Sequence, residues 1–324
     1  MAGQEAATVM IGADEVRAAV PMPTAIAALQ GALREGLDPE TDPARSVVPV
    51  EHGQLLLMPS QSRHYAGVKI ASVAPANPGL GRPRIQGNYL LLDAETLTPL
   101  AVLDGVALTA IRTAAVSAAA ADLLADPGAE RLVVFGTGPQ AHSHVEALRA
   151  VRPLRHLTVV GRDPARLRSF LQAYEDSALT VVEGGPRAVA DADVVACCTS
   201  ARTPLFDGAI LPPHATVTAV GSHEPDAREV DDAAVRRSTV VVEARTAALR
   251  EAGDIIQPVR AGVLNPETLV TLAALVRGTA VVDRSRPRLF KSVGMAWEDL
   301  VVAGAAYEAV AGTGGGRGGP DGGE

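Results

Sequence analysis

The sequence contains few aromatic residues and almost no cysteine. Only 3% of its 324 residues are aromatic, so a core drawn from its 47% hydrophobic residues must consist mainly of Ala, Val and Leu. The two cysteines, Cys197 and Cys198, are neighbours, and neighbouring side chains in a strand point to opposite faces. A disulfide between them is therefore not expected, and this cysteine usage is typical of a cytoplasmic protein.

The sequence also lacks an excess of basic residues, a long apolar run, and histidines at the spacing of metal ligands. The formal net charge of -8 argues against nucleic acid or an anionic membrane surface as a partner. No run approaches the roughly 18 apolar residues of a membrane span, and no signal segment stands at the N-terminus. His142 and His144 are two apart and do not share a helix face, so no metal site is expected. We therefore expect a soluble, cytoplasmic protein.

What the sequence does contain is a regular alternation from Arg131 onward. Short β-rich runs such as "RLVVFG", "HLTVVGR" and "VVACCT" alternate with helical stretches such as "ARLRSFLQAYED". This order predicts an α/β fold with a parallel sheet covered on both faces. The earlier part is richer in proline and turns, and runs such as "GVKIASVAP" indicate antiparallel strands. Between them, the Ala-rich stretch that Thr109 would cap is predicted to be a helix connecting two domains.

A nucleotide-binding motif follows the first run of the alternating part. "VVFGTGPQAHSHVEAL" places Gly136, Thr137, Gly138, Gln140 and Ala141 between a strand and a helix, the context that Gly-x-Gly-x-x-Gly/Ala requires. The first glycine allows the tight turn, the second lets backbone approach a pyrophosphate, and alanine lets the helix pack closely on the strand. The motif predicts dinucleotide binding.

The end of the next strand bears on the choice of dinucleotide. NAD sites usually place an acid there to bind the ribose 2′-hydroxyl. Here the strand ends in Gly161 and Arg162, and the guanidinium is suited to a 2′-phosphate, while Asp163 is expected to cap the following helix. We expect NADP(H) to be preferred, with NAD(H) possible.

Several segments in order resemble the ornithine cyclodeaminase/mu-crystallin family. They are "ALTAIRTAAVSAAAADLLA", "FGTGPQAHSHVEAL", "ADVVACCTSARTPLF", "AVGSHEPDAREVD" and "FKSVGMAWEDLVVA". The resemblance implies a Rossmann-type parallel-sheet NAD(P) domain over residues 116–295. It also implies an α+β substrate-binding and dimerisation domain over residues 1–115 and 296–324, and a homodimer. Within the latter, the glycine-rich stretch 312–324 is expected to be disordered.

Three basic residues of the first part are candidates for a carboxylate site. Lys69 lies inside the apolar run "AGVKIASV", where a lysine is costly to bury unless an anion pairs with it. Arg112 is expected in the first turn of the Ala-rich helix, whose field favours an anion, and Arg45 precedes another apolar run. The resemblance matches all three to substrate-carboxylate and adjacent cofactor contacts. We assign catalysis to Lys69 and Arg112, with Lys69 as proton donor to the substrate nitrogen.

The resemblance also implies the remaining site residues. Ser292 falls where the family contacts the nicotinamide end of the cofactor. We expect Thr199, Val220 and Ser222, which end or follow two other strands, to contact the cofactor as well. Met58, His223 and Val293 are expected to line the substrate site.

This chain departs from the cyclodeaminase pattern at two places. Cyclodeaminases carry an Asp where His223 stands, and a Glu where Leu56 stands. Internal cyclisation needs a placed base, whereas reduction of a preformed cyclic ketimine needs a bound carboxylate, a protonated imine and a hydride. In the same loop, Asp226 and Glu229 are spaced like a capping box.

We therefore expect an NADPH-dependent reductase that converts Δ1-pyrroline-2-carboxylate or Δ1-piperideine-2-carboxylate to proline or pipecolate. Two alternatives within the family remain open at this point, an ornithine cyclodeaminase using His223 and an alanine-type amino-acid dehydrogenase. A third is a mu-crystallin-like protein that binds NADPH and a ligand without turnover. The sequence does not fix the ring size of the substrate.

Overall fold

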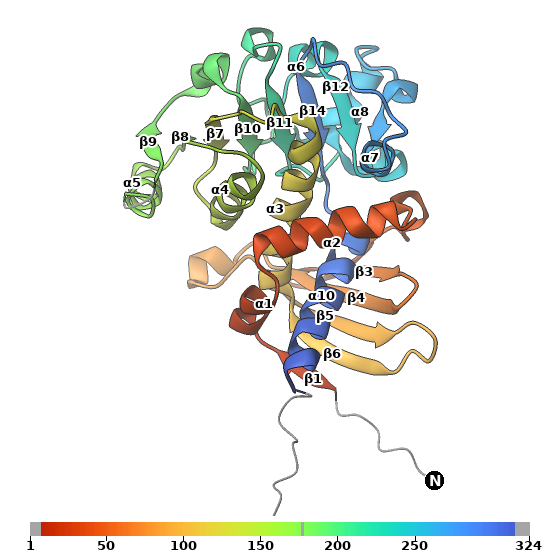
Figure 1. The fold of residues 1–324 in the computed structure, drawn as a ribbon. Coiled ribbons are helices and arrows are strands. Elements are labelled where there is room, and N and C mark those ends of the chain that lie inside the picture. The colour runs from red at the N-terminus through yellow and green to blue at the C-terminus, as the bar shows by residue number, and fades with distance from the viewer. Residues whose placement is uncertain (1–7, 176–177, 315–324) are drawn as a thin grey trace, which may run out of the picture. The chain divides into compact units, whose positions relative to one another are not determined.

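The computed structural model describes residues 8–175 and 178–314 and divides into two compact units (Figure 1). Unit 1 comprises Met1–Ala28, Asp42–Arg112 and Ala296–Glu324. Unit 2 comprises Leu29–Thr41 and Thr113–Met295.

One short segment belongs to a different unit from the one expected. The division predicted from the sequence gave residues 29–41 to the first domain, whereas this segment clusters with unit 2. Arg277 donates to the carbonyl oxygens of Leu33 and Leu37, and the Glu40 carboxylate accepts the backbone N–H groups of Arg245 and Thr246. These long-range bonds, which no local pattern reveals, attach the segment to unit 2.

Unit 1 is built on a six-stranded sheet with the order β1-β6-β5-β4-β3-β2. Its strands are β1 (Val9–Ile11), β2 (Ser46–Val50), β3 (Gly53–Gln61), β4 (Tyr65–Val73), β5 (Ile85–Asp93) and β6 (Pro99–Asp104). The pairs from β2 to β6 are antiparallel, as the turn-rich sequence predicts, and β1 runs parallel to β6.

One face of this sheet is buried beneath helix α10 (Ala296–Gly314), which contacts β3, β4 and β5. Met58, Lys69 and Tyr89 are register partners across these strands, and each residue is at most 3% exposed. Alternation along a strand puts residues two apart on the same face, so Ser60 and Ala71 share this buried face. The lysine therefore lies in the middle of the unit 1 core.

The opposite face of the sheet is also largely apolar. Leu57 pairs with Ile70, and Val68 pairs with Leu90, all of them on this outer face. Ile70 is 46% exposed and Val48, further along the same face, is 42% exposed. A sheet face in permanent contact with water normally carries polar residues, so this face is unusually apolar for an exposed one.

Helix α3 (Gly105–Leu124) carries the chain from unit 1 into unit 2. It begins four residues before the expected cap at Thr109, and Asp104 caps it by accepting the backbone N–H of Ala107 at 2.7 Å. Arg112 therefore lies beyond the first turn, and the argument from the helix N-terminal field is wrong for it. The helix is long and apolar enough to cross a membrane by length and composition, but 72% of the relevant window is buried inside the structure.

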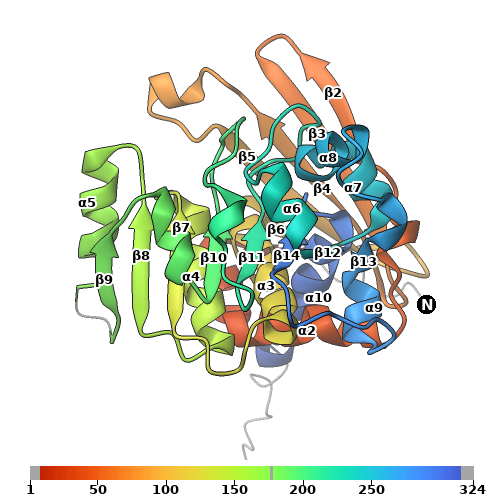
Figure 2. The same cartoon turned by 90° about the horizontal axis from the view of Figure 1, so that it is seen from above.

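Unit 2 is built on an eight-stranded, wholly parallel sheet with the order β13-β12-β14-β11-β10-β7-β8-β9 (Figure 2). Its strands are β7 (Arg131–Phe135), β8 (His156–Val160), β9 (Thr180–Glu183), β10 (Val194–Cys197), β11 (Thr216–Ala219), β12 (Thr239–Val242), β13 (Val270–Thr271) and β14 (Arg288–Lys291). The order reverses between β7 and β10, which is the switch point of a Rossmann sheet. The α/β fold class with a Rossmann-type domain is confirmed.

The helices of both units are short to medium in length. They are α1 (Ala13–Ala19), α2 (Met22–Arg34), α4 (Pro139–Val151), α5 (Pro164–Gln172), α6 (Asp232–Arg237), α7 (Arg245–Glu251), α8 (Gly253–Arg260) and α9 (Leu272–Val276). Single 3-10 turns occur at η1 (Pro39–Thr41), η2 (Asn77–Leu80), η3 (Pro186–Asp191), η4 (Gly208–Ile210) and η5 (Pro266–Thr268). At the C-terminus, 312–314 complete α10 rather than starting a disordered tail, and the rest of that predicted tail lies outside the described residues.

Candidate active site

The loop between β7 and α4 has the backbone shape of a phosphate cradle. Gly136 has a φ of +112°, and a Cβ there would lie 2.5 Å from the carbonyl oxygen of Cys198, so only glycine fits. Gly138 is the N-cap of α4, and no atom of the described chain lies within 4 Å of the position its Cβ would take. Ala141 is fully buried, while Thr137 in this loop and Gln140 in the first turn of α4 are half-buried. Open backbone at a helix N-terminus fits a dinucleotide pyrophosphate.

The end of β8 lacks the acid of an NAD-type site. A Cβ at Gly161 would lie 2.8 Å from Cγ2 of Thr137, in the loop just described. Asp163 is the N-cap of α5 and accepts the backbone N–H groups of Ala165 and Arg166, so the predicted cap is confirmed. Arg162 and the Arg166 side chain are exposed at this strand end. The strand end therefore offers two guanidinium groups and no acid at the glycine.

The other predicted cofactor residues follow three adjacent strands, β10, β11 and β14. Thr199 and Val220 are half-buried, whereas Ser222 and Ser292 are at most 3% exposed. The Ser222 hydroxyl donates to the carbonyl oxygen of Ala227, and the Ser292 hydroxyl accepts the N–H of Gly294 at 3.2 Å. In this structure both hydroxyls shape their own loops.

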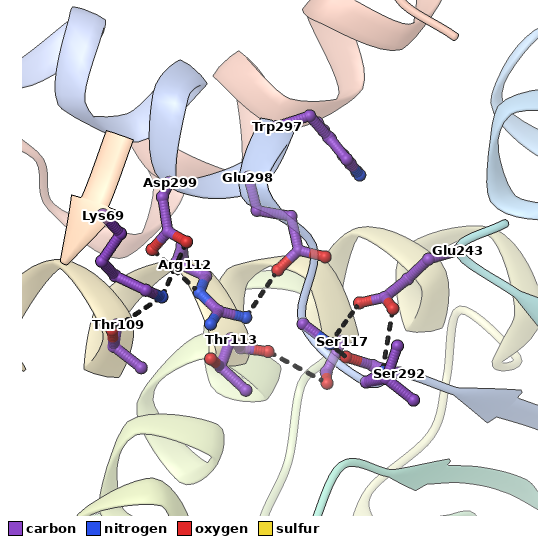
Figure 3. A network of polar contacts seen from close by, with 12 residues as sticks. Lys69, Thr109, Arg112, Thr113, Ser117, Glu243, Ser292, Trp297, Glu298 and Asp299 are labelled. Carbon is purple, nitrogen blue, oxygen red and sulfur yellow. Dashed lines mark hydrogen bonds and ion pairs between the residues drawn. The ribbon is translucent and has the colours of Figure 1, made fainter. Parts of the chain in front are cut away.

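A buried carboxylate orders the last of these loops. Glu243, which follows β12, accepts the N–H of Val293 at 2.9 Å and that of Gly294 at 3.3 Å, and Figure 3 shows it beside Ser292. Val293, predicted to line the substrate site, is 8% exposed. The backbone of Val293 is thus held by the Glu243 side chain at the carboxyl edge of the sheet.

The loop after β11 differs from the sequence prediction. Helix α6 begins at Asp232 with Asp231 as its cap, so the capping box proposed for Asp226 and Glu229 is wrong. Asp226 forms an exposed ion pair with Arg202, whereas Glu229 is completely buried and accepts backbone N–H groups from neighbouring loops. His223 is exposed on this loop.

In unit 1, the predicted catalytic cations form a buried cluster with two carboxylates (Figure 3). Lys69 Nζ lies 2.7 Å from Asp299 Oδ2 and 3.3 Å from Thr109 Oγ1. Arg112 Nε lies 3.2 Å from Asp299 Oδ1. Asp299 thus bridges the two cations from the first turn of α10.

Glu298 completes this cluster. Its Oε2 lies 2.8 Å from Arg112 Nη1, and its side chain, like that of Asp299, is fully buried. The two cations and two carboxylates in direct contact are formally neutral, which makes their burial tolerable. The two carboxylates hold the guanidinium and the ammonium in fixed positions.

The cluster changes the acidity of Lys69. Burial, together with the nearby Arg112 and Arg45, lowers the pKa of Lys69 to about 8, while Asp299 acts in the opposite direction. Arg45, half-buried in the loop before β2, is therefore electrostatically coupled to Lys69. The structure brings together the three cations that the sequence singled out. An ammonium with this pKa is protonated at neutral pH and releases its proton readily.

Two more polar groups belong to the same region of unit 1. Asp42 accepts the Ser60 hydroxyl at 2.6 Å and the backbone N–H of Trp297 at 2.7 Å, which ties the loop preceding Arg45 to the start of α10. Burial raises the pKa of Asp42 to about 6. Tyr89 is fully buried, and its hydroxyl has no hydrogen-bond partner among residues 8–175 and 178–314. An unsatisfied buried hydroxyl on the same face as Lys69 suits a polar ligand.

Asp299, Glu298, Asp42 and Tyr89 were not identified from the sequence. The acidic pair stands in "WEDLVVA", in an otherwise apolar helix, and two adjacent acids before such a run are a weak signal that could have prompted attention. Nothing local indicates that their partners lie 186 to 230 residues away.

The two units contain different chemical groups, one set suited to a dinucleotide and the other to a carboxylate-bearing small molecule. Unit 2 has a dinucleotide cradle at the switch point of a parallel sheet. Unit 1 has a proton-donating ammonium and guanidinium groups suited to a carboxylate. These are the groups needed to bind and protonate a small imino acid.

Comparison with known proteins agrees with this description. The model of the ornithine cyclodeaminase/mu-crystallin family matches residues 6–314. A Delta(1)-pyrroline-2-carboxylate reductase of Bacillus cereus (strain ZK / E33L) is 34% identical over 311 residues, which cover 92% of this chain and 95% of the relative. A Delta(1)-pyrroline-2-carboxylate/Delta(1)-piperideine-2-carboxylate reductase of Azospirillum brasilense is 37% identical over 271 residues, covering 83% and 85%.

Among solved structures, a similar one is that of Thermococcus litoralis Delta(1)-pyrroline-2-carboxylate reductase in complex with NADH and L-proline. It superposes with a TM-score of 0.88 at 30% identity, covering 95% of this chain and 98% of that one.

Proposed function

Since this chain belongs to the ornithine cyclodeaminase/mu-crystallin family, we propose that it is an NADPH-dependent reductase of a cyclic ketimine. The substrate is Δ1-pyrroline-2-carboxylate or Δ1-piperideine-2-carboxylate, and the product is proline or pipecolate. The observation that carries the proposal is the buried Lys69, held beside Arg112 by Asp299. The reductase activity of the relatives supports the same reaction.

The chemistry requires a proton on nitrogen and a hydride on carbon. Lys69 protonates the ring nitrogen, which makes C2 electron-poor. When bound, the reduced dinucleotide supplies the hydride to C2. The π electrons of the C=N bond become the lone pair of the ring amine, and Lys69 regains its proton from water. The net change is the addition of one hydride and one proton across C=N.

The substrate carboxylate is assigned to the guanidinium groups. Arg112 is fixed by two carboxylates, and Arg45 lies near enough to alter the pKa of Lys69. Planar guanidinium groups bind a carboxylate with defined geometry, which sets the orientation of the imine next to it. Asp299 acts as a positioning residue because it holds both cations.

The family alternatives receive less support from this chain. The cyclodeaminase carboxylate position is occupied by His223, which is exposed in the structure. The second position, Leu56, is apolar and pairs with Ala71 in the sheet. A reductase uses only groups that this chain has, whereas cyclisation needs a base at those positions.

The preference for NADPH rests on the end of β8. Gly161 carries no acid and a Cβ there would crowd the Thr137 methyl group, while Arg162 together with Arg166 provides positive charge for a 2′-phosphate. The Thermococcus relative was solved with NADH, so the dinucleotide preference of this chain is a separate question.

A homodimer is also part of the proposal. The outer face of the unit 1 sheet carries Val48, Leu57, Ile70 and Leu90, on strands whose other face forms the core. Apolar residues on both faces of an antiparallel sheet support coverage by a second copy.

The proposal is tested by incubating the pure protein with NADPH and a panel of substrates. The panel contains both cyclic ketimines, ornithine, and pyruvate with ammonia. NADPH oxidation with a cyclic ketimine and formation of the cyclic amino acid support the reductase. Ammonia release from ornithine, consumption of pyruvate and ammonia, or tight NADPH binding without turnover would each point to one of the alternatives instead.

A further inference from the structure

Glu229 is a buried carboxylate that the proposed reaction does not use. Its side chain is inaccessible to solvent and accepts hydrogen bonds from three donors. Oε1 accepts the backbone N–H and the hydroxyl of Thr199, both at 2.8 Å, and Oε2 accepts the backbone N–H of Gly221 at 2.7 Å. All three donors point at an acceptor that is fully satisfied only as a carboxylate.

These donors come from two loops that frame the carboxyl edge of the parallel sheet. Thr199 follows β10 and Gly221 follows β11, and the two strands are neighbours. The loops also touch directly, because a Cβ at Gly221 would lie 1.8 Å from the carbonyl oxygen of Thr199. Ligands of such sheets bind outside the carboxyl ends of the strands near the switch point, which here lies between β7 and β10.

A second layer of charge supports Glu229. Asp254 on α8 accepts the backbone N–H groups of Glu229 and Val230 at 2.6 and 3.0 Å. Lys291, the last residue of β14, lies 2.9 Å from Asp254 Oδ2 and donates to the carbonyl oxygen of Ser222 at 2.6 Å. The network therefore connects the ends of three strands, β10, β11 and β14.

We propose that Glu229 is a positioning residue for the dinucleotide: as a carboxylate it holds the ends of β10 and β11 in the binding arrangement, and its protonation releases them. The inference rests on the proposed function for the identity of the ligand as a nicotinamide dinucleotide. It predicts that dinucleotide affinity falls as the pH is lowered through neutrality.

The surroundings of Glu229 bring its protonation close to neutral pH. Burial and the nearby Asp254 raise the pKa of Glu229 to about 7, against the opposing influence of Lys291 and of the bonds from Thr199. Cys197 at the end of β10 and Cys198 after it also interact electrostatically with this carboxylate, and burial raises the pKa of both thiols. When Glu229 is protonated, one of its oxygens carries a hydrogen. This hydrogen then points toward the hydrogen of a backbone or hydroxyl donor. At least one of the three hydrogen bonds is then reversed in direction or lost.

The test is a fluorescence titration of the whole protein with NADH between pH 5.5 and pH 8.5. NADH is chosen because it lacks the 2′-phosphate, a group that itself titrates near pH 6. If only the carboxylate form binds, a pKa of about 7 makes the Kd roughly tenfold higher at pH 6 than at pH 8. Glu229→Gln is expected to bind NADH more weakly at pH 8 and to show a nearly flat profile.

Asp193→Asn is a matched control. Asp193 likewise accepts two backbone N–H groups, those of Glu130 and Arg131 at 2.9 Å, but at the amino end of β7. We expect this variant to lose thermal stability while keeping the Kd and pH profile of the wild type. If the role of Glu229 were purely structural, Glu229→Gln would likewise lose thermal stability and keep the Kd and pH profile of the wild type.

Several outcomes overturn the inference. One is a wild-type Kd that does not change between pH 6 and pH 8, a result that needs no variant and therefore decides the matter even where Glu229→Gln fails to fold. Another is a Glu229→Gln protein with wild-type affinity and pH slope. Absence of NADH and NADPH binding by the wild type would instead refute the proposed function, and this inference with it.

Discussion

Replacing Asp299 with Asn removes the charge that holds Lys69 protonated. Asp299 Oδ2 lies 2.7 Å from Lys69 Nζ, and its other oxygen lies 3.2 Å from Arg112 Nε. The amide has nearly the same shape as the carboxylate, so the substitution changes charge more than volume. Lys69 then remains buried beside Arg112 without its counter-ion.

The size of the effect follows from the acidity of Lys69. Its pKa of about 8 already includes the opposing influence of Asp299. An opposite charge at this distance is worth about 1–3 pKa units, so the pKa of Lys69 in Asp299→Asn should fall to roughly 5–7. With a value near 6, about 3% of Lys69 is protonated at pH 7.5, compared with about three quarters in the wild type. Breaking a buried pair also costs about 3–5 kcal/mol of stability, part of which Glu298 offsets by keeping its bond to Arg112.

The assay is kcat/KM for the cyclic ketimine as a function of pH, with a melting temperature recorded at each pH. The wild type should lose activity as the pH rises through about 8, because the proton donor is then deprotonated. In Asp299→Asn the same loss should occur about 1–3 pH units lower, with a roughly 20-fold deficit at pH 7.5 that shrinks as the pH is lowered. The imine substrate is the same in both assays, so its own pKa does not contribute to the difference between the two pH profiles.

Glu298→Gln is the matched control, since Glu298 forms its ion pair with Arg112 Nη1. It should raise KM through weaker carboxylate binding while leaving the alkaline limb near pH 8. An unshifted alkaline limb in folded Asp299→Asn would refute the reasoning that Lys69 is the proton donor under the control of Asp299.

Three further substitutions test other parts of the account. Arg162→Asp should shift the ratio of kcat/KM values from NADPH toward NADH by at least tenfold, and an unchanged ratio would refute its role at the 2′-phosphate. Ile70 is 46% exposed on the outer face of the unit 1 sheet, and Ile70→Glu should convert a dimer to monomers in light scattering. The control Val182→Glu, at a site 47% exposed on β9, should leave the dimer intact. A monomeric wild type would contradict the proposed dimer. Gly221→Ala places a Cβ 1.8 Å from the Thr199 carbonyl oxygen and should cost about 1–3 kcal/mol of stability in a denaturant titration. In the control Gly185→Ala, the new Cβ meets no described atom within 4 Å beyond its chain neighbours, so the same titration should show little change.

The parts of the fold that depend on local patterns were predictable from the sequence. The alternation of apolar runs and helical stretches fixes the Rossmann sheet, and the spacing of Gly136 and Gly138 fixes the turn that a dinucleotide needs. Asp163 was recognisable as a cap because it directly precedes Pro164 at a helix start.

Long-range contacts were not predictable. A buried lysine demands an anion, but nothing near Lys69 in sequence identifies Asp299, which reaches it only through the packing of α10 on the sheet. Glu229 was assigned to a helix cap because a carboxylate in a loop before a helix usually serves there. Its burial follows from how closely the loops after β10 and β11 approach each other, and this is a tertiary property.

The exact start of α3 illustrates a smaller failure. Thr109 resembles a cap, yet Asp104 lies earlier and accepts the Ala107 N–H, so the helix begins at Gly105. The Thr109 hydroxyl instead donates to the Gly105 carbonyl oxygen and accepts from Lys69. A residue that looks like a helix start in the sequence therefore belongs to the cationic cluster.

The central claim is that this chain reduces a cyclic ketimine with NADPH. It is tested most directly by following NADPH absorbance in the presence of Δ1-pyrroline-2-carboxylate and Δ1-piperideine-2-carboxylate and measuring the amino acid formed. The account predicts one proline or pipecolate for each NADPH consumed, with the activity greatly reduced in Lys69→Met. Failure of both ketimines to oxidise NADPH, or normal turnover by Lys69→Met, would contradict it.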